Sequence, residues 1–564
     1  MVLAAISVGA FTCVGVFVLP FFFPPHHPAQ SGSYSAGFNN RIAVLAAGTA
    51  CVLTFLWSYF FDSPKEYSRA EKQSAIPIRV VVACLGACGL FTAFFGWVLT
   101  KAGFAYNDNL YFIESMHSAI DFHLRVYRDF SFLYGPALLA WPVLVASLLR
   151  PFHISIQASY FVALTVFQLA GVLLLWATLE RLPLSRKSRM AALCVFTLAV
   201  VCPLFGLNYS LVRALLPFST LLFMSRIRRP LPMAVAFFLG EILQLLFSPE
   251  LGVAFAGGAC IYALCMRARL GRLWLAPFVA PIFGVIAFVG TVGKIYLDSM
   301  GAFSKGFLSL VIEPLPHILL LLVSAVWLVP TMAAGLLRKR REDAMIILSL
   351  AVTSLGLLPV AFGRCDPVHV VFNGVGIFLL ASMALSGYTE RVRKFWWAVL
   401  VLVVLWMQFV NMMVFFPSVR DAVRIAVLGT EDRETIDIAK LSDIVGRDRI
   451  AVPFLIAYSV EQQLIDAQLY APDRECFNIR VWDDESETAK ALRMNQSRWA
   501  LIPKKDMRFR EDSLVQWIVL GIGFPYRDRQ EPWGYGEILN ANLNAQWKAV
   551  AEFGDLILYE RKPS

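Results

Sequence analysis

Long apolar stretches separated by short charged segments run along the chain from its first residues to position 417. Each stretch is about 16 to 24 residues long, enough for a helix to cross roughly 30 Å of hydrocarbon. Thirteen of them lie at 2–24, 41–61, 78–99, 156–179, 189–206, 211–225, 230–248, 251–266, 274–297, 316–337, 344–362, 368–386 and 395–417. The pattern predicts a polytopic α-helical membrane protein with about 13 transmembrane helices.

A fourteenth apolar segment, YGPALLAWPVLVASLLRPF at 134–152, is short and contains three prolines. If it does not cross, six connections fall on one side of the membrane and carry 21 of the 30 Lys and Arg residues before position 418. If it crosses, the first of these connections lands opposite the other five, which breaks the positive-inside bias. We therefore expect a juxtamembrane or re-entrant helix on the outer face and a cytoplasmic N-terminus.

The residues after Pro417 have a different pattern. Positions 418–564 hold 20 Lys and Arg against 24 Asp and Glu, with short mixed runs such as RIAVPFLIAYS and GDLILYERK. Such alternation predicts strands among helices, and a segment of this length can form one small domain with its own core. Because an odd number of spans precedes it, we expect an extracytoplasmic α/β domain.

The composition supports a membrane protein and narrows its partners. Hydrophobic residues make up 58% of the 564 residues, and the mean hydropathy is +0.63, which is outside the range of soluble globular proteins. The formal net charge of +10 belongs to the predicted cytoplasmic loops, where it orients the protein and is no sign of nucleic-acid binding. Neither a Walker loop nor a GxGxxG motif occurs, so ATP-driven transport has no support.

The richest candidate chemistry lies at 104–136, FAYNDNLYFIESMHSAIDFHLRVYRDFSFLYGP, directly after an apolar span. Carboxylates, histidines and arginines stand there among Tyr and Phe. Charged groups at a membrane boundary are costly unless they are paired, hydrated or functional. Such a mixture would suit a substrate with a sugar end and a lipid end. The acids could bind or activate hydroxyls, the arginines could bind a phosphate, and the aromatic side chains could stack on sugar rings or lie at the membrane interface. The alternative is an ordinary polar loop with an aromatic belt.

Further polar residues converge on the same predicted outer face. They are Asn208, Arg213, Glu250, Asp298, Lys305, Glu313, His317, Arg364, Asp366, His369 and Asn373. Some have a structural alternative, because Glu250 could cap the next helix and Asp366 before Pro367 is a good helix start. His117 and His123 lack a third ligand at a recognisable spacing, so we expect them to pack in the loop.

The arrangement resembles the GT-C superfamily of membrane glycosyltransferases, which includes protein O-mannosyltransferases and aminoarabinose transferases. In that family a transmembrane helix opens into a long external loop whose first residues hold an acidic catalytic residue, then Tyr and often Glu. Asp108, Tyr111 and Glu114 in NDNLYFIE stand in that arrangement, and the helix at 134–152 is similar to the juxtamembrane helix that follows. The resemblance covers about 78–564 in outline and implies three parts. They are a two-helix N-terminal addition at 1–77, a catalytic module at 78–417 with its external loop at 100–155, and the domain at 418–564.

The resemblance implies transfer of a sugar from a polyprenyl-phosphate-linked donor to an envelope glycan, lipid or protein acceptor, in a bacterial inner (plasma) membrane. Asp108 would be the catalytic carboxylate, and Arg364, with Lys305 or Arg213 as second choices, would face the departing phosphate. The candidate substrate-binding residues are Tyr111, Glu114, Asp129, Tyr134, Arg213, Glu250, Lys305, Arg364, Asp366 and His369.

The sequence departs from the family at one place. Many members carry a second acidic residue in the external loop after the fourth helix, where NYSLVR here offers Asn208 and Arg213. No cofactor is therefore certain, and a divalent metal remains possible. Three other classes stay open: a lipid-linked glycan polymerase or ligase outside this fold, a secondary transporter, and a non-catalytic scaffold.

Overall fold

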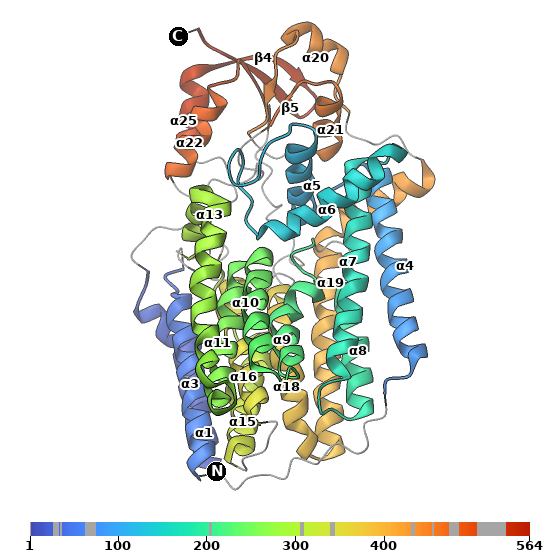
Figure 1. Ribbon diagram of the computed structural model, residues 1–564. Coiled ribbons are helices and arrows are strands. Elements are labelled where there is room, and N and C mark those ends of the chain that lie inside the picture. The colour runs from blue at the N-terminus through green and yellow to red at the C-terminus, as the bar shows by residue number, and fades with distance from the viewer. Residues whose placement is uncertain are drawn as a thin grey trace.

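The structure is a computed structural model of the chain. It describes residues 2–25, 33, 36–61, 75–105, 107–201, 206–304, 309–338, 344–429, 435–453, 456–472, 484–504 and 537–563. A long helical bundle carries a small α/β domain at one end, and the N-terminus lies at the opposite end (Figure 1).

The helices of the bundle follow the apolar pattern of the sequence. They are α1 (Val2–Cys13) with the turns η1 (Val14–Val18) and η2 (Leu19–Phe22), α3 (Asn40–Phe61), α4 (Ile78–Ala102), α5 (Asn107–Ile120), α6 (Pro136–Leu149) with η3 (Arg150–Phe152), α7 (Ile156–Leu179), α8 (Arg186–Val200), α9 (Leu211–Met224), α10 (Pro230–Phe247), α11 (Pro249–Cys265), α12 (Arg267–Leu270) with η4 (Gly271–Leu275), α13 (Ala276–Ser304), α14 (Pro316–Leu322), η5 (Val323–Leu328), α15 (Val329–Arg338), α16 (Ala344–Leu355), α17 (Leu358–Arg364), α18 (Pro367–Ala384) with η6 (Leu385–Gly387), and α19 (Glu390–Leu428).

The chain is a polytopic membrane protein. Among the residues described, 9 helical segments are long and apolar enough to cross a membrane, and shorter apolar helices lie at Ile6–Phe22, Pro136–Phe152, Leu211–Met224 and Pro249–Cys265. The membrane class predicted from the sequence is confirmed, whereas the count of thirteen spans stays a prediction.

Helix α18 lies at the centre of the bundle. Of its apolar window, 94% is buried inside the protein, compared with 22% for α4. It contacts helices α9, α14, α16, α17 and α19. A polar residue in the first turn of this helix is therefore surrounded by protein, and it needs partners from neighbouring elements.

Helices α5 and α6 lie at the end of the bundle that carries the α/β domain (Figure 1). Helix α6 runs obliquely across this end and contacts α5, α7 and α10 (Figure 1). Its start is fixed by Gly135, whose N–H donates to the Phe247 carbonyl at 3.0 Å. A Cβ at Gly135 would lie 2.3 Å from the Leu246 carbonyl oxygen, so only glycine permits this approach.

The α/β domain is built on one five-stranded mixed sheet of order β2-β1-β3-β5-β4. Strand β1 (Ile450–Ala451) pairs in parallel with β2 (Tyr470–Ala471) and β3 (Trp499–Pro503), whereas β5 (Leu556–Arg561) is antiparallel to β3 and to β4 (Trp547–Phe553). Its helices are α20 (Ile438–Val445), α21 (Tyr458–Asp466), α22 (Asp484–Met494) and α25 (Glu537–Gln546).

Helices cover both faces of this sheet, as the alternation of side chains along β3 requires. Trp499 and Leu501 pack in a cluster with α20 and α21, whereas Ala500 and Ile502 pack in a second cluster with α22 and α25. Figure 1 shows the two helix pairs on either side of the strands. The predicted mixture of strands and helices is present in the described part of this segment.

The expected boundary at 417/418 falls inside a helix. Helix α19 runs without a break from Glu390 to Leu428 and ends at Gly429, which takes a left-handed conformation with φ 65°. The helix that begins in the bundle thus continues past the expected boundary through a mixture of charged and apolar residues. The division of the chain into domains stays a prediction.

Candidate functional site

Asp108 lies in the first turn of α5, where the chain turns back from the end of α4. Helix α4 ends at Gly103 in a left-handed conformation, and α5 begins at Asn107. A carboxylate in a first turn is stabilised by the partial positive charge of the helix N-terminus. The segment before α9 packs closely against it, since a Cβ at Gly206 would lie 3.0 Å from Asp108 Cβ.

Tyr111, one turn beyond Asp108, holds the loop that leads back to α6. Its hydroxyl accepts a hydrogen bond from the Leu133 N–H at 2.5 Å, and its ring stacks on Phe132 with centroids 5.4 Å apart. Phe112 stacks in turn on Tyr134 at 5.9 Å. Tyr111 is buried, and its ring packs edge-on against the ring of Tyr134 with centroids 6.3 Å apart.

Tyr134 begins a polar chain that leads to α9 and α11. Its hydroxyl accepts a hydrogen bond from Asn208 Nδ2 at 2.9 Å, and the Arg213 guanidinium lies 5.7 Å from its ring centroid. Arg213 also donates to the Asn208 carbonyl at 3.1 Å and forms an ion pair with Glu250. Glu250 does not cap α11, which has Ser248 at its N-cap position. The ion pair instead joins α9 to α11.

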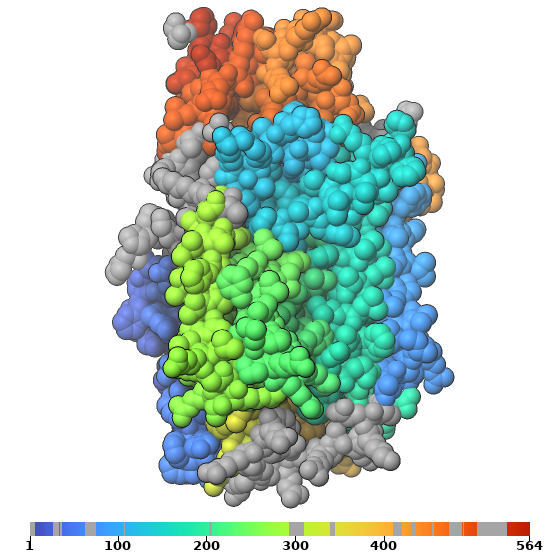
Figure 2. Space-filling model, in the orientation of Figure 1, coloured from blue at the N-terminus to red at the C-terminus, as the bar shows by residue number. Residues whose placement is uncertain are grey.

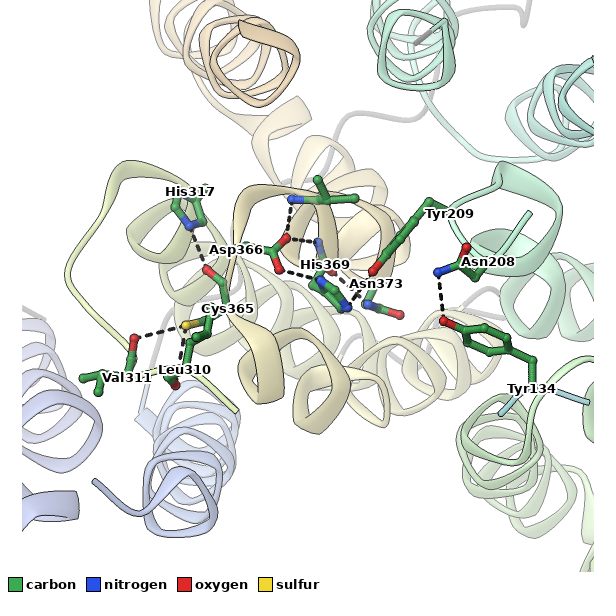
Figure 3. A network of polar contacts seen from close by, with 11 residues as sticks. Tyr134, Asn208, Tyr209, Leu310, Val311, His317, Cys365, Asp366, His369 and Asn373 are labelled. Carbon is green, nitrogen blue, oxygen red and sulfur yellow. Dashed lines mark hydrogen bonds and ion pairs between the residues drawn. The ribbon is translucent and has the colours of Figure 1, made fainter. Parts of the chain in front are cut away.

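Arg364 and Asp366 flank the sharp connection between α17 and α18. Cys365 between them has φ 32°. This lies in the left-handed region, which residues other than glycine adopt rarely. The Cys365 carbonyl accepts a hydrogen bond from His317 Nε2 at 2.9 Å, and its thiol contacts the carbonyls of Leu310 and Val311 (Figure 3). The contacts of Cys365 with His317 and with the carbonyls of Leu310 and Val311 thus hold the connection that begins at Arg364.

Asp366 is the N-cap of α18, as the sequence predicts. Its Oδ1 accepts hydrogen bonds from the Val368 and His369 N–H groups, both at 3.0 Å. Its Oδ2 lies 2.7 Å from His369 Nδ1, and His369 Nε2 lies 3.0 Å from the Tyr209 hydroxyl. Figure 3 shows His369 between Asp366 and Tyr209, with Asn208 and Tyr134 facing each other beside them.

Two buried tyrosines report which charges lie near one another. Burial raises the pKa of Tyr134, Asp108 raises it further, and Arg213 and Arg364 oppose the rise. Burial likewise raises the pKa of Tyr209, with Asp108 adding to the rise and Arg364 opposing it. The same carboxylate and the same guanidinium act on both rings. Asp108 and Arg364 therefore lie within electrostatic range of both tyrosines, although the four residues come from separate parts of the chain.

Several buried polar atoms in this site lack a partner among the residues described. They are Nε of Arg213, Nε of Arg364 and Oδ1 of Asn208. Unsatisfied buried donors are rare and call for an explanation, such as a ligand or water that completes the hydrogen bonds. Two guanidinium groups with donors left unpaired by the described residues, both within electrostatic range of Tyr134, fit an anionic ligand such as a phosphate group.

Other candidate residues lie elsewhere. Glu114 is buried on α5 and hydrogen-bonds Glu461 of α21, so it faces the α/β domain. Asp129 pairs with Arg125 at 3.1 Å, and hydrogen bonds to Arg125 hold the pKa of its carboxyl below the usual range. No described contact joins Asp129 to Asp108. Lys305 lies outside the described residues.

The possible divalent metal has no evident set of protein ligands in the described part of the chain. No group of three or more His, Cys, Asp or Glu side chains there could hold a metal ion. The acids of the site have other partners, because Glu250 pairs with Arg213 and Asp366 pairs with His369. The described residues therefore do not fit a metal held by three protein side chains.

The structure adds residues that the sequence did not single out. Tyr209 joins His369, and Tyr160 of α7 donates from its hydroxyl to Asn109 Oδ1 at 2.7 Å, next to Asp108. Neither tyrosine belongs to a recognisable motif. Tyr209 stands in NYSLVR, whose place in an outer loop was the only available signal.

No family model and no curated protein matches this sequence. Among solved structures, the chain is similar to two crystal structures of ArnT from Cupriavidus metallidurans. The structure bound to undecaprenyl phosphate has 13% sequence identity and a TM-score of 0.43. The apo structure has 12% identity and a TM-score of 0.42. In each comparison 86% of this chain and 99% of the other chain are covered.

The identity and the TM-score are both low. The likeness therefore transfers no residue role, substrate or acceptor to this chain.

Proposed function

We propose that this protein transfers a sugar from a polyprenyl-phosphate-linked donor to a glycan, lipid or protein acceptor at the outer face of the membrane. The observation that carries the proposal is that Asp108 and Arg364 both lie within electrostatic range of Tyr134 and Tyr209, at one end of a membrane bundle. A carboxylate can accept the proton of a hydroxyl, and a guanidinium can bind a phosphate. The apolar helices provide a surface for the lipid tail.

In the proposed reaction Asp108 accepts the proton of the acceptor hydroxyl as its oxygen bonds to the anomeric carbon of the sugar. The bond between that carbon and the donor phosphate oxygen breaks, and the polyprenyl phosphate leaves with the electron pair. Arg364 stabilises the charge that develops on the phosphate, with Arg213 nearby. Tyr134 and Tyr209, on which both charges act, would contact the sugar.

We also propose the orientation and the division of the chain. The N-terminus is cytoplasmic, the α/β domain is extracytoplasmic, and the membrane is a bacterial inner membrane. Residues 1–77 are a two-helix addition, 78–417 form the catalytic module with its external loop at 100–155, and 418–564 hold the terminal domain with the end of α19. The basic connections support this orientation through the positive-inside rule.

The test is sugar transfer by the purified protein in lipid vesicles, with undecaprenyl phosphate carrying a hexose, a pentose or an amino sugar as donor. Asp108→Asn should lower transfer by about 100 to 10,000-fold, the usual effect of removing a positioned general base. It should still bind the donor lipid, because the phosphate is held by arginines. Arg364→Ala should weaken binding of that lipid.

Asp443→Asn is the matched control, because Asp443 is exposed on α20 of the α/β domain. It should transfer sugar at the wild-type rate. Full transfer by Asp108→Asn at a normal protein level would remove Asp108 from the mechanism. If the wild type neither transfers any of the sugars nor binds undecaprenyl phosphate in preference to undecaprenol, the proposed function is wrong.

A further inference from the structure

Tyr209 is fixed in the short segment between α8 and α9. Its backbone N–H donates to the Gly206 carbonyl at 3.0 Å, and its own carbonyl accepts from Gln168 Nε2 at 3.2 Å. The ring meets His369 edge-on, with centroids 5.1 Å apart and an interplanar angle of 82°. A buried side chain held in this way presents its hydroxyl in one direction.

The proton positions on His369 follow from Asp366. Burial would raise the pKa of the Asp366 carboxyl, but the attraction of His369 and Arg364 and its hydrogen bonds outweigh burial and leave the pKa well below the usual range. An ionised carboxylate only accepts hydrogen bonds. His369 Nδ1, at 2.7 Å from that carboxylate, therefore carries a proton.

At a pH at which His369 is neutral, its Nδ1 carries the single ring proton and its Nε2 is an acceptor. The Tyr209 hydroxyl, 3.0 Å away, donates its proton to this nitrogen. A hydroxyl oxygen that donates its own proton can also accept a hydrogen bond, and both Asp108 and Arg364 act electrostatically on Tyr209. An oxygen oriented as an acceptor attracts a group that can donate, such as a hydroxyl, and it repels the oxygens of an ionised phosphate.

We propose that Tyr209 contacts the substrate by accepting a hydrogen bond from a sugar or acceptor hydroxyl, and that His369 and Asp366 are positioning residues that orient the Tyr209 hydroxyl. This inference rests on the proposed function. It assigns the hydroxyl-bearing part of the substrate to Tyr209 and the phosphate to Arg364. His369 and Asp366 then act through Tyr209 and do not touch the substrate.

Three variants test the orientation. Tyr209→Phe removes the hydroxyl and keeps the ring, and it should lower the transfer rate roughly three- to tenfold, the effect of one lost hydrogen bond. In His369→Gln the longer amide can still reach Tyr209, so transfer should stay near the wild-type rate. In His369→Asn the amide keeps the contact with Asp366 and falls short of Tyr209, so the loss should match that of Tyr209→Phe.

Two further measurements separate this role from simple packing. The double variant Tyr209→Phe/His369→Asn should be no slower than either single variant, because both changes remove the same interaction. Binding of undecaprenyl phosphate should change by less than about twofold in all of these variants, since Arg364 is intact. Equal losses in His369→Gln and His369→Asn, or additive losses in the double variant, would overturn the proposal.

Tyr262→Phe is the matched control. Tyr262 is a buried tyrosine of α11 whose hydroxyl donates to the Ser225 carbonyl at 3.2 Å, outside the site. It should transfer sugar at the wild-type rate. A loss equal to that of Tyr209→Phe would show that any buried tyrosine hydroxyl matters for stability alone, and the substrate contact would be rejected.

A spectroscopic readout keeps this inference distinct from the proposed function. The protein has 7 histidines, and the ¹⁵N signals of His369 are identified by their loss in His369→Gln. A protonated Nδ1 and an Nε2 signal that shifts in Tyr209→Phe support the orientation. A protonated Nε2, or no shift, overturns it. If the wild type transfers no sugar, the substrate contact falls with the proposed function, whereas the orientation is decided by these signals.

Discussion

Arg213 combines a structural and a proposed chemical role in one side chain. It is buried and forms an ion pair with Glu250, and its Nε has no partner among the described residues. Arg213→Ala would leave Glu250 without its ion-pair partner; an unsatisfied buried group costs about 1–3 kcal/mol, and the 30% exposure of the Glu250 side chain places the cost at the lower end. We expect a lower unfolding temperature in detergent together with weaker binding of the donor lipid.

A double variant separates the two roles. Arg213→Met with Glu250→Gln removes both charges, and replacing a buried ion pair in this way often restores stability. We expect the unfolding temperature to recover while binding of undecaprenyl phosphate stays weak. Wild-type binding by the stable double variant would limit Arg213 to its structural role.

At the residue scale, the sequence identifies a candidate when local context marks it. Asp108 comes shortly after an apolar span, and Tyr111 and Glu114 follow it at intervals of three residues. The sequence pattern alone therefore identified Asp108 as a candidate. Tyr209 could not be found in this way, because its partner His369 lies 160 positions away in the chain. The orientation of Glu114 was also beyond sequence analysis, since it depends on how the α/β domain docks.

At the scale of elements, α5 links the site to the α/β domain. His117 Nε2 lies 3.2 Å from the Tyr458 hydroxyl of α21, and Glu461 of the same helix is buried against Glu114. In the space-filling view the domain sits directly on the segment that contains α5 and α6 (Figure 2). Movement of α21 would therefore act on the helix that carries Asp108.

The acids in this interface make the docking depend on pH. Burial raises the pKa of Glu461, and Tyr470, His117 and Glu114 reduce the rise without cancelling it. A raised pKa means that the docked state favours the protonated carboxyl. Docking should therefore be strongest below the ordinary pKa of Glu and weaken as the pH rises through the raised value. Each pKa unit corresponds to about 1.4 kcal/mol.

Hydrogen exchange of α21 as a function of pH measures this effect. Exchange should speed up at higher pH more than its intrinsic rate does, and Glu461→Gln should remove the excess because the amide has no charge to lose. Glu552→Gln is the control, since the Glu552 side chain is 65% exposed on β4. The same excess exchange in Glu461→Gln and the wild type would contradict the assignment to Glu461.

Apolar pattern predicted most elements of the bundle and missed where some of them end. Runs such as 156–179 match helix α7 because a continuous apolar run of that length is itself the signal. The same signal stops at Pro417, whereas α19 continues to Leu428 through residues in which arginines and an aspartate interrupt the apolar run. A mixed segment of this kind has no continuous apolar run, so its extent as a helix was not evident from that signal.

At the scale of the whole molecule, the charges and the fold support one orientation. The basic connections at 226–229, 267–273 and 387–394 follow or precede helices at the end of the bundle away from the α/β domain (Figure 1). By the positive-inside rule we expect that end to face the cytoplasm. Asp108, Arg364 and the α/β domain then lie at the outer end together, where a lipid-linked donor and an external acceptor can meet.

Labelling of single cysteines in a cysteine-free background tests this orientation. Ala268→Cys on α12 and Ala541→Cys on α25 replace the same residue type at two exposed positions, one at each end of the molecule. In intact cells an impermeant thiol reagent should label Ala541→Cys and leave Ala268→Cys unlabelled, because the bilayer excludes the reagent from the basic end. After permeabilisation both should react equally, which shows that the two thiols are equally accessible. Labelling of Ala268→Cys alone would place the α/β domain in the cytoplasm and would invert both the predicted topology and the proposed outer site.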